Sequence, residues 1–260
     1  MPDIPLPAGF RIFSSEAPEH FLGSHGLLDL QDSRLRLRAR ALTQLCKTDR
    51  DKAMAIHNYV KKLPFEKRFK LRLHTARQVL DAGTGDAPDK AALLVALLRL
   101  ARIPARLRYV ELKGEILRGL TNGVVTAGRP VAEIWLHGRW VRTDTYIFDV
   151  AYMAAARQRL KDQDWEWGYG IHRNGQSIWN GTDDAFLGGY PTESDPMVVR
   201  VLGVYHDPRD YVNSKLFRSK HAPLARALQW SMLSLGMRKV VRKLREEGKP
   251  DAGEQARRPL

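Results

Sequence analysis

The stretch Gly85-Asp86-Ala87-Pro88-Asp89-Lys90-Ala91-Ala92-Leu93-Leu94 decides the fold of this chain. It opens with a glycine turn and continues into a segment that is apolar on every side as far as Leu98. A helix that is hydrophobic all round belongs in the middle of a core. Pro88 suits the first helical position, where its missing N–H needs no partner, and the pattern predicts a core helix over residues 88–102. Residue 87 then lies at the mouth of a buried helix, where free N–H groups favour an anion.

Several more helices are predicted from apolar periodicity and from residues that start or stop helices. They are a helix capped by Ser33 that carries Leu35, Leu42 and Leu45, a second opened by Asp49 or Asp51 and stopped by Pro64, a short one from Thr75 to Gly83, one over residues 150–161 capped by Asp149, and a last one over about 222–247 that ends at Gly248.

Strands are predicted where apolar and polar residues alternate. They cover residues 106–112 after Pro104, a hairpin of 131–136 and 139–143 with His137-Gly138 as its turn, and a further strand near 197–205. The glycine-containing segment 113–128 is predicted as a loop that could serve as a lid. Helices first, and then a buried helix that feeds an antiparallel sheet, give the α+β fold class.

Composition narrows the class of protein and its location. The single cysteine, Cys46, excludes an intramolecular disulfide and a cysteine-rich zinc site, and the pattern around it favours a small buried hydrophobe. No apolar run approaches the ~18 residues that a membrane span needs, and the start of the chain lacks a basic, apolar signal segment. We therefore expect a soluble, cytoplasmic protein. The histidines lack the spacing of a helical metal pair, so neither a metal nor a cofactor is expected.

The net charge of +14, from 43 basic and 29 acidic residues, favours acidic partners and anionic surfaces. The basic excess is spread along the length of the chain and carries no recognisable nucleic-acid-binding signature. Nucleic acid is therefore not the expected partner.

Two blocks of the sequence resemble the transglutaminase-like superfamily, whose fold is papain-like. The first is Gly85-Asp86-x-x-Asp89-Lys90-Ala91 with Ile103-Pro104-Ala105-Arg106, and the second is the strand pair Val131-Ala132-Glu133-Ile134-Trp135-Leu136-x-Gly138-Arg139-Trp140-Val141 followed by Asp144. The resemblance covers residues of about 50–150. It implies a papain-like core in which a buried central helix packs on an antiparallel sheet, with extra helices at both ends of the chain.

The resemblance also implies a Cys-His-Asp triad, and this chain departs from it at two positions. The family reads Gly-x-Cys where this chain has Ala87, and the family's histidine, four residues before Glu133, falls on Arg129. Only the aspartate is kept, as Asp144. Alanine offers no nucleophile, and arginine stays protonated near neutral pH and cannot act as a general base. We expect instead that Arg129 and Asp144 form a charge-assisted pair on neighbouring strands.

The chain is expected to divide into three parts. An irregular lead-in covers residues 1–31, a transglutaminase-like domain covers 32–220, and a basic amphipathic helix with a polar tail covers 221–260. Within the domain, residues 162–196 form long loops rich in aromatic residues and glycine, which often wall a pocket.

Three hypotheses about function follow. The first is a non-catalytic protein that binds a peptide, acyl or amine ligand at the helix mouth, and its candidate ligand-binding residues are Asp86, Asp89, Trp135, His172 and Trp179. The second is an enzyme with a rewired site for amide or C–N bonds, which would use Asp86, Asp89 or a loop histidine such as His172. The third is a scaffold whose C-terminal helix, with its stripe of Leu233, Met237, Val240 and Leu244, docks on a membrane, a nucleic acid or an acidic partner.

Overall fold

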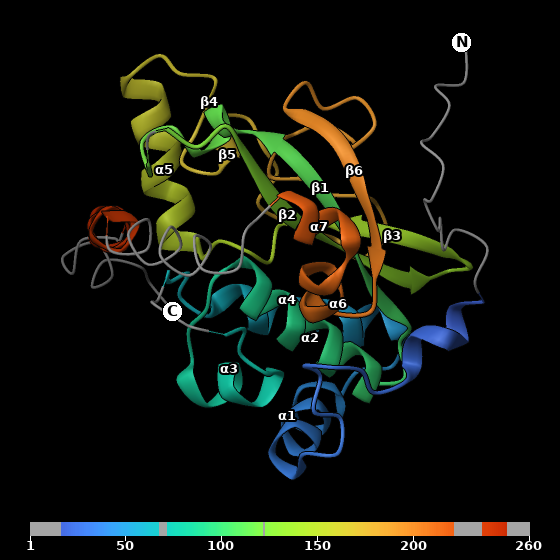
Figure 1. Cartoon of the computed structure of the whole chain (residues 1–260). Coiled ribbons are helices and arrows are strands. Elements are labelled where there is room, and N and C mark those ends of the chain that lie inside the picture. Colours follow the sequence, from blue (N-terminus) through green and yellow to red (C-terminus); the bar gives the residue numbers. More distant parts are fainter. Residues whose placement is uncertain (1–16, 68–71, 122, 221–235, 249–260) are drawn as a thin grey trace, which may run out of the picture.

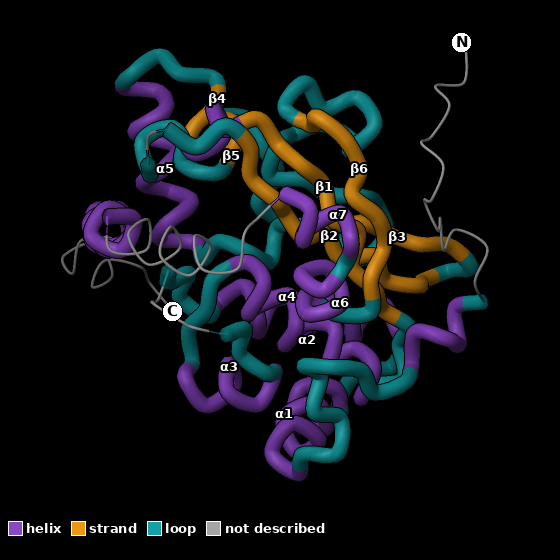
Figure 2. The backbone as a smooth tube through the Cα atoms, viewed as in Figure 1, coloured by secondary structure: helices purple, strands orange, loops and turns teal. Residues whose placement is uncertain are grey.

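Helix α4 (Ala87–Leu100) lies beneath a four-stranded antiparallel sheet with the strand order β3-β2-β1-β6 (Figure 1). The computed structural model describes residues 17–67, 72–121, 123–220 and 236–248. Helices α1, α2 and α3 contact α4 and lie on the opposite side from the sheet (Figure 2). The fold class is α+β, as the sequence predicts.

The described elements are as follows. The helices are η2 (Pro18–Leu22), α1 (Ser33–Thr43), α2 (Asp49–Lys62), α3 (Ala76–Ala82), α4 (Ala87–Leu100), η3 (Gly114–Leu117), α5 (Val150–Asp162), α6 (Pro208–Asn213) and α7 (Lys215–Lys220). The strands are β1 (Ala105–Lys113), β2 (Thr126–Leu136), β3 (Arg139–Thr143), β4 (Trp167–Gly168), β5 (Ile171–His172) and β6 (Val198–Tyr205). Residues 236–247 are also helical.

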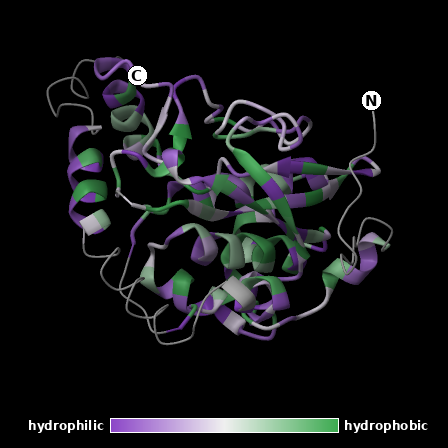
Figure 3. Cartoon of the chain, turned by 45° about the horizontal axis from the view of Figure 1, so that its top comes forward, coloured by the Kyte–Doolittle hydropathy of each residue, from purple (hydrophilic) through white to green (hydrophobic). Residues whose placement is uncertain are grey.

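The predicted core helix is confirmed as α4. Its residues from Asp89 to Arg99 are all buried, and Figure 3 shows hydrophobic residues concentrated where the sheet meets the helices. The helix begins at Ala87, one residue earlier than predicted, because the Asp86 side chain accepts the Asp89 N–H and so acts as the N-cap. Pro88 therefore takes the second helical position and not the first.

Two of the predicted helix caps are wrong by one residue or more. Asp32, and not Ser33, caps α1, since its carboxylate accepts the N–H groups of the next turn. Thr48 caps α2, in place of Asp49 or Asp51, which lie inside the first turn. The predicted caps of α3 and α5 are confirmed: Thr75 forms a capping box, Gly83 ends α3 with a left-handed φ of 63°, and Asp149 accepts the Tyr152 N–H.

The sheet divides into two faces by the pairing of β1 with β2. Leu107 lies opposite Ala132 on the face that joins the main core, whereas Arg106 lies opposite Glu133 on the other face. There Glu133 accepts Arg106 Nε at 2.6 Å and Arg108 Nε at 2.5 Å. Strands β1, β3 and β6 are close to the predicted ranges, whereas β2 begins five residues before the predicted Val131.

Three segments differ from the prediction. The predicted loop 113–128 contains the 3-10 helix η3 and the start of β2 at Thr126, since glycine-rich spacing alone conceals short elements. The described part of the lead-in holds η2, which buries Phe21. Helices α6 and α7 and strands β4 and β5 have 6 residues or fewer, which is too short to show a period in the sequence.

Three buried basic side chains, Lys61, Lys90 and Arg99, donate to backbone carbonyl groups, and Lys90 is fully buried. Its Nζ donates to the carbonyl oxygens of Leu63 at 2.8 Å, Ile147 at 2.8 Å and Lys61 at 3.3 Å. Burial holds the pKa of Lys90 well below its ordinary value. Arg99 is bonded in the same manner to three further segments, through Gly23, Ala105 and His206.

The C-terminal helix over residues 236–247 packs on this same domain. Met237, Val241 and Leu244 are buried in the main core, and Arg245 Nε lies 3.3 Å from Asp149 Oδ2. Leu233 and the predicted start of this helix lie outside the described residues. Within the described ranges, no helix combines the length and the apolar character needed to cross a bilayer.

His57 gives the pH dependence of stability a testable sign. Burial lowers its pKa to about 3, helped by the nearby Lys61, so the unfolded chain binds a proton below pH 6.5 that the folded chain refuses. As the pH is lowered from 6.5 towards 3, we expect His57 to reduce the free energy of unfolding by about 1.4 kcal/mol per pH unit. His57→Gln should remove that part of the slope in chemical unfolding, while His137→Asn, in the exposed hairpin turn, should keep it. Equal slopes in His57→Gln and the wild type would contradict the assignment.

Candidate active site

Two buried carboxylates lie at the start of α4, and each accepts a hydrogen bond from the backbone N–H of the other residue. Asp86 accepts the Asp89 N–H and Asp89 accepts the Asp86 N–H, which is a reciprocal capping box. Asp86 Oδ2 also lies 2.9 Å from Lys67 Nζ, and Asp89 Oδ2 lies 3.3 Å from His74 Nδ1. Asp86 is 1% exposed and Asp89 3% exposed. Both candidates are therefore part of the internal bonding of the helix start.

Ala87 and Pro88 are half-buried and give the helix mouth its surface. Neither side chain carries a polar atom, so nothing at position 87 can attack a carbonyl carbon or hold a metal. The N–H groups of the first turn are in part already used by Asp86, which lowers the attraction of this end of the helix for an anion.

The predicted pair between Arg129 and Asp144 is present. Arg129 Nη1 lies 3.1 Å from Asp144 Oδ2, and Arg129 Nη2 donates to the Gly170 carbonyl at 2.5 Å. The other carboxylate oxygen of Asp144 accepts the Leu187 N–H at 2.7 Å. Arg129 is 9% exposed and Asp144 2% exposed, so the pair is closed off from water. Burial raises the pKa of Asp144, and Arg129 opposes that rise.

Short hydrogen-bonded links join the helix mouth to this ion pair. Lys90, one turn into α4, bonds to the Ile147 carbonyl, and the Ile147 N–H donates to the Asp144 carbonyl at 3.1 Å. Tyr109 lies opposite Pro130, the residue after Arg129, on the sheet. Burial raises the pKa of Tyr109 well above its ordinary value, and the Asp86 carboxylate adds to that rise. Two parts that the family resemblance assigns to one centre are therefore linked in this structure.

Two predicted walls of the pocket lie elsewhere. Trp135 is six residues along β2 from Arg129, which amounts to about 20 Å in a strand. It packs edge-on against Trp140, with ring centroids 5.3 Å apart. Trp179 is 2% exposed, donates to the Asp183 carbonyl at 2.9 Å and fills the core beside the His57 ring. Aromatic residues in glycine-rich loops here cover the core.

His172 is buried and both of its ring nitrogens have partners. Nε2 lies 3.2 Å from Glu166 Oε1, and Nδ1 accepts the Asn174 N–H at 3.1 Å, so Nε2 carries the proton. Its ring packs against Trp167 at 4.3 Å between centroids. Trp167 packs on the face of the sheet that carries Val110 and Val131, and not at the helix mouth.

Sequence reasoning missed the groups that close the ion pair. The Gly170 carbonyl and the Leu187 N–H are backbone groups, which leave no mark in residue type. Asp195, a half-buried carboxylate, was also missed, and burial raises its pKa while Arg129 and His172 lower it. Gly188 lies against Asp195 in space, and a side chain at position 188 would collide with the Asp195 carboxylate. The glycine at position 188 is therefore a sequence feature that points to a close contact.

Metal and thiol chemistry find no support among the described residues. Within the described ranges, no group of three or more His, Cys, Asp or Glu side chains is placed to hold a metal ion. Cys46 follows the end of α1 and is half-buried, so its predicted full burial is wrong, because α1 ends at Thr43 before the apolar pattern does. The Cys46 thiol donates to the Leu42 carbonyl at 3.7 Å.

Comparison with known proteins identifies one family and one solved structure. Residues 36–145 match the family model of the Transglutaminase-like superfamily. The crystal structure of a protein from Cytophaga hutchinsonii, provisionally named as a cysteine protease, is 18% identical with a TM-score of 0.39. The match covers 47% of this chain and 39% of that chain, so it spans well under half of the solved protein. No curated protein matches the sequence.

Removing Arg129 tests whether the ion pair is a structural element. We expect Arg129→Met to lower the free energy of unfolding by about 3–5 kcal/mol, because Asp144 is left buried and charged without a partner. The loss should shrink as the pH falls and the Asp144 carboxylate takes up a proton, since burial already raises its pKa. Chemical unfolding at several pH values measures both effects.

The double variant Arg129→Met with Asp144→Asn is the matched control. Asparagine keeps an oxygen for the Leu187 N–H and carries no charge, so this variant should recover part of the stability at neutral pH. A double variant no more stable than Arg129→Met would show that the buried charge is not the cause.

Proposed function

We propose, from the premise that residues 36–145 carry a transglutaminase-like domain, that this protein is a non-catalytic binding protein and neither an amidase nor a transamidase. The observation that carries the proposal is the Arg129–Asp144 pair. In a Cys-His-Asp centre the imidazole takes the thiol proton and the aspartate orients the ring. Here Arg129 takes the place of the imidazole, and an arginine side chain stays protonated near neutral pH. Its two terminal nitrogens donate to the Asp144 carboxylate and the Gly170 carbonyl.

The contacts at the helix mouth support binding over a rewired enzyme. A general base must reach the proton that it removes. Asp86 and Asp89 are buried and bonded to the first turn of α4, and His172 has partners on both ring nitrogens. Using any of these groups as an acid or base would first require an internal bond to break.

Docking through the C-terminal helix has weaker support. The apolar side of residues 236–247 is buried in the domain, so it is not available to enter a bilayer. The exposed basic residues Lys239, Arg242 and Lys243 remain on the outer side. Any partner on that surface would be held by charge, and its binding would weaken steeply with salt.

The ligand class follows from what remains at the helix mouth. Ala87 and Pro88 present a small apolar surface beside the buried carboxylates of Asp86 and Asp89. An anion would meet a helix end whose charge Asp86 already offsets. Asp86 is itself paired with Lys67, so a cation gains little there either. Among the peptide, acyl and amine ligands of the hypothesis, this favours a neutral group at the Ala87 surface.

Activity measurements test the proposal directly. The purified chain, incubated with glutamine-containing peptides and a primary amine, should release ammonia and incorporate amine at the rate of the blank. The reason is that position 87 has no nucleophile and position 129 has no base. Mass spectrometry of the peptides measures both products.

Two variants make that result decisive. Wild-type turnover above the blank would overturn the proposal, and its loss in Asp86→Asn or Asp89→Asn would point to the rewired enzyme. Ala87→Cys with Arg129→His restores both reactive groups, so alkylation of its thiol at neutral pH reports whether the helix mouth still accommodates a family-type centre.

A further inference from the structure

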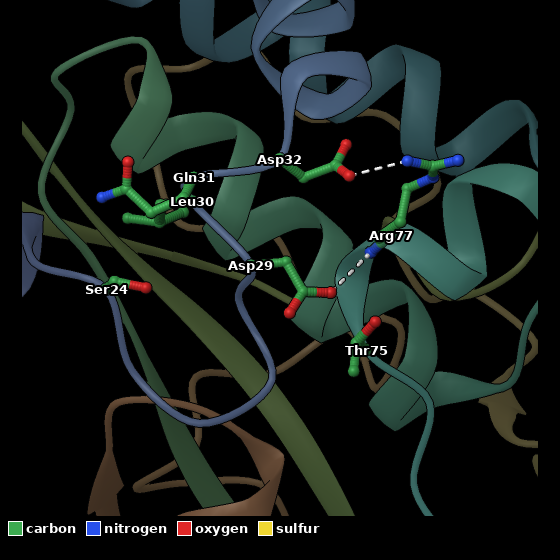
Figure 4. A pocket seen from close by; sticks show the side chains of 7 residues that line it. All are labelled: Ser24, Asp29, Leu30, Gln31, Asp32, Thr75 and Arg77. Atoms are coloured by element: carbon green, nitrogen blue, oxygen red, sulfur yellow. Dashed lines mark hydrogen bonds and ion pairs between the residues drawn. The ribbon is translucent and has the colours of Figure 1, made fainter.

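An open pocket of about 500 Å³ lies between the loop before α1 and the start of α3 (Figure 4). This volume falls within the roughly 300–1,000 Å³ of small-molecule sites. None of its lining residues belongs to the helix mouth or to the Arg129–Asp144 pair. The lining residues are Ser24, Asp29, Leu30, Gln31, Asp32, Thr75 and Arg77.

Two of the three charged residues of this pocket neutralise each other. Asp32 Oδ1 accepts N–H groups at the start of α1, and Asp32 Oδ2 lies 2.6 Å from Arg77 Nη1. Arg77 Nε lies 2.8 Å from Asp81 Oδ2, so this guanidinium is bonded to two carboxylates. An incoming anion would have to displace one of them.

Asp29 is the charged residue of this pocket for which the described part of the chain shows no ion pair. The Asp29 carboxylate accepts a weak hydrogen bond from the backbone N–H of Arg77, at 3.4 Å. A left-handed φ of 48° fixes the backbone that presents this carboxylate. In the view of Figure 4, Ser24 lies to the left of Asp29 and Thr75 to its lower right, and both hydroxyl-bearing side chains line the pocket.

The local charge of the pocket is opposite to that of the chain. Among the lining side chains, Asp29 and Asp32 are negative and Arg77 is positive, so they carry an excess of negative charge on a chain of +14. The Arg36 guanidinium lies at the edge of the pocket, where it donates to the Leu30 carbonyl and to Gln31 Oε1. Because charges are screened beyond about 8 Å at physiological salt, the lining residues and the adjacent Arg36 set the preference, and the more distant basic residues contribute little.

We propose that this pocket binds a small organic cation that carries hydroxyl groups, in the manner of an amino sugar. The ammonium group pairs with Asp29, the hydroxyl groups bond to Ser24 and Thr75, and the carbon frame rests on Leu30. One solvent-facing carboxylate makes a weak site, with a Kd of about 1 mM or above.

Glucosamine is the probe, and glucose is its neutral counterpart of nearly the same shape. The full chain is titrated at slightly acidic pH while amide chemical shifts are recorded by NMR. The Arg77 amide should shift with glucosamine, because that N–H donates to Asp29. Glucose should shift it far less. No shift with glucosamine, or equal shifts with both sugars, would overturn the proposal.

Asp29→Asn removes the charge and keeps the shape, since asparagine also tolerates a left-handed backbone. It should weaken glucosamine binding by about two- to fivefold, the effect expected from the loss of one exposed charge pair. Asp164→Asn is the matched control, because Asp164 is an exposed aspartate with a φ of 47° outside the pocket. Ser24→Ala, at an exposed loop position, provides a second variant with an expected loss of a few fold. Equal weakening in Asp29→Asn and Asp164→Asn would show that binding is not at this pocket.

Discussion

The arrangement of the domain depends on the hydrogen bonds that the Lys90 side chain makes to backbone carbonyl groups. Its ammonium group bonds to carbonyl groups at the end of α2 and in the loop after β3, and it does so from the first turns of the buried helix α4. Those carbonyls at the end of α2 would otherwise lack a partner in a dry interior. One side chain therefore sets the position of the helix mouth relative to Asp144. The apolar residues of α4 supply the driving force for burial, but they do not by themselves fix this register.

The Arg129–Asp144 pair also links separate segments of the chain through buried hydrogen bonds, on the other side of the sheet. It joins β2, the end of β3 and the loop segments at Gly170 and Leu187. A catalytic imidazole needs freedom to exchange protons, whereas a guanidinium with two bonded nitrogens holds these segments together. The Arg129 guanidinium thus cross-links Asp144, just after β3, to the loop segment at Gly170.

The sequence predicted what depends on residue type and missed what depends on the backbone. The apolar run after Lys90, the alternation in β1 and the Thr75 and Asp149 caps each identify an element locally, and each is confirmed. The pairing of Arg129 with Asp144 was also predicted, because the family resemblance places these two positions side by side; Asp144 lies one residue after the end of β3. The Gly170 and Leu187 contacts arise from long-range chain folding. Trp135 and Trp179 were predicted to line a pocket on composition, yet composition cannot tell a pocket wall from a core cover.

Burial lowers the pKa of several basic side chains in this domain. Acid–base catalysts work best with a pKa near the working pH. Burial lowers the pKa of His57 to about 3 and that of His206 to about 4, so both imidazoles are neutral and poorly basic. Lys61, with a pKa lowered to about 8 by burial, comes closer to neutrality. Its ammonium, however, is bonded to the Thr145 and Phe148 carbonyls, and losing its proton would weaken the loop that carries Asp144. The buried polar groups of this domain thus hold its segments in fixed positions.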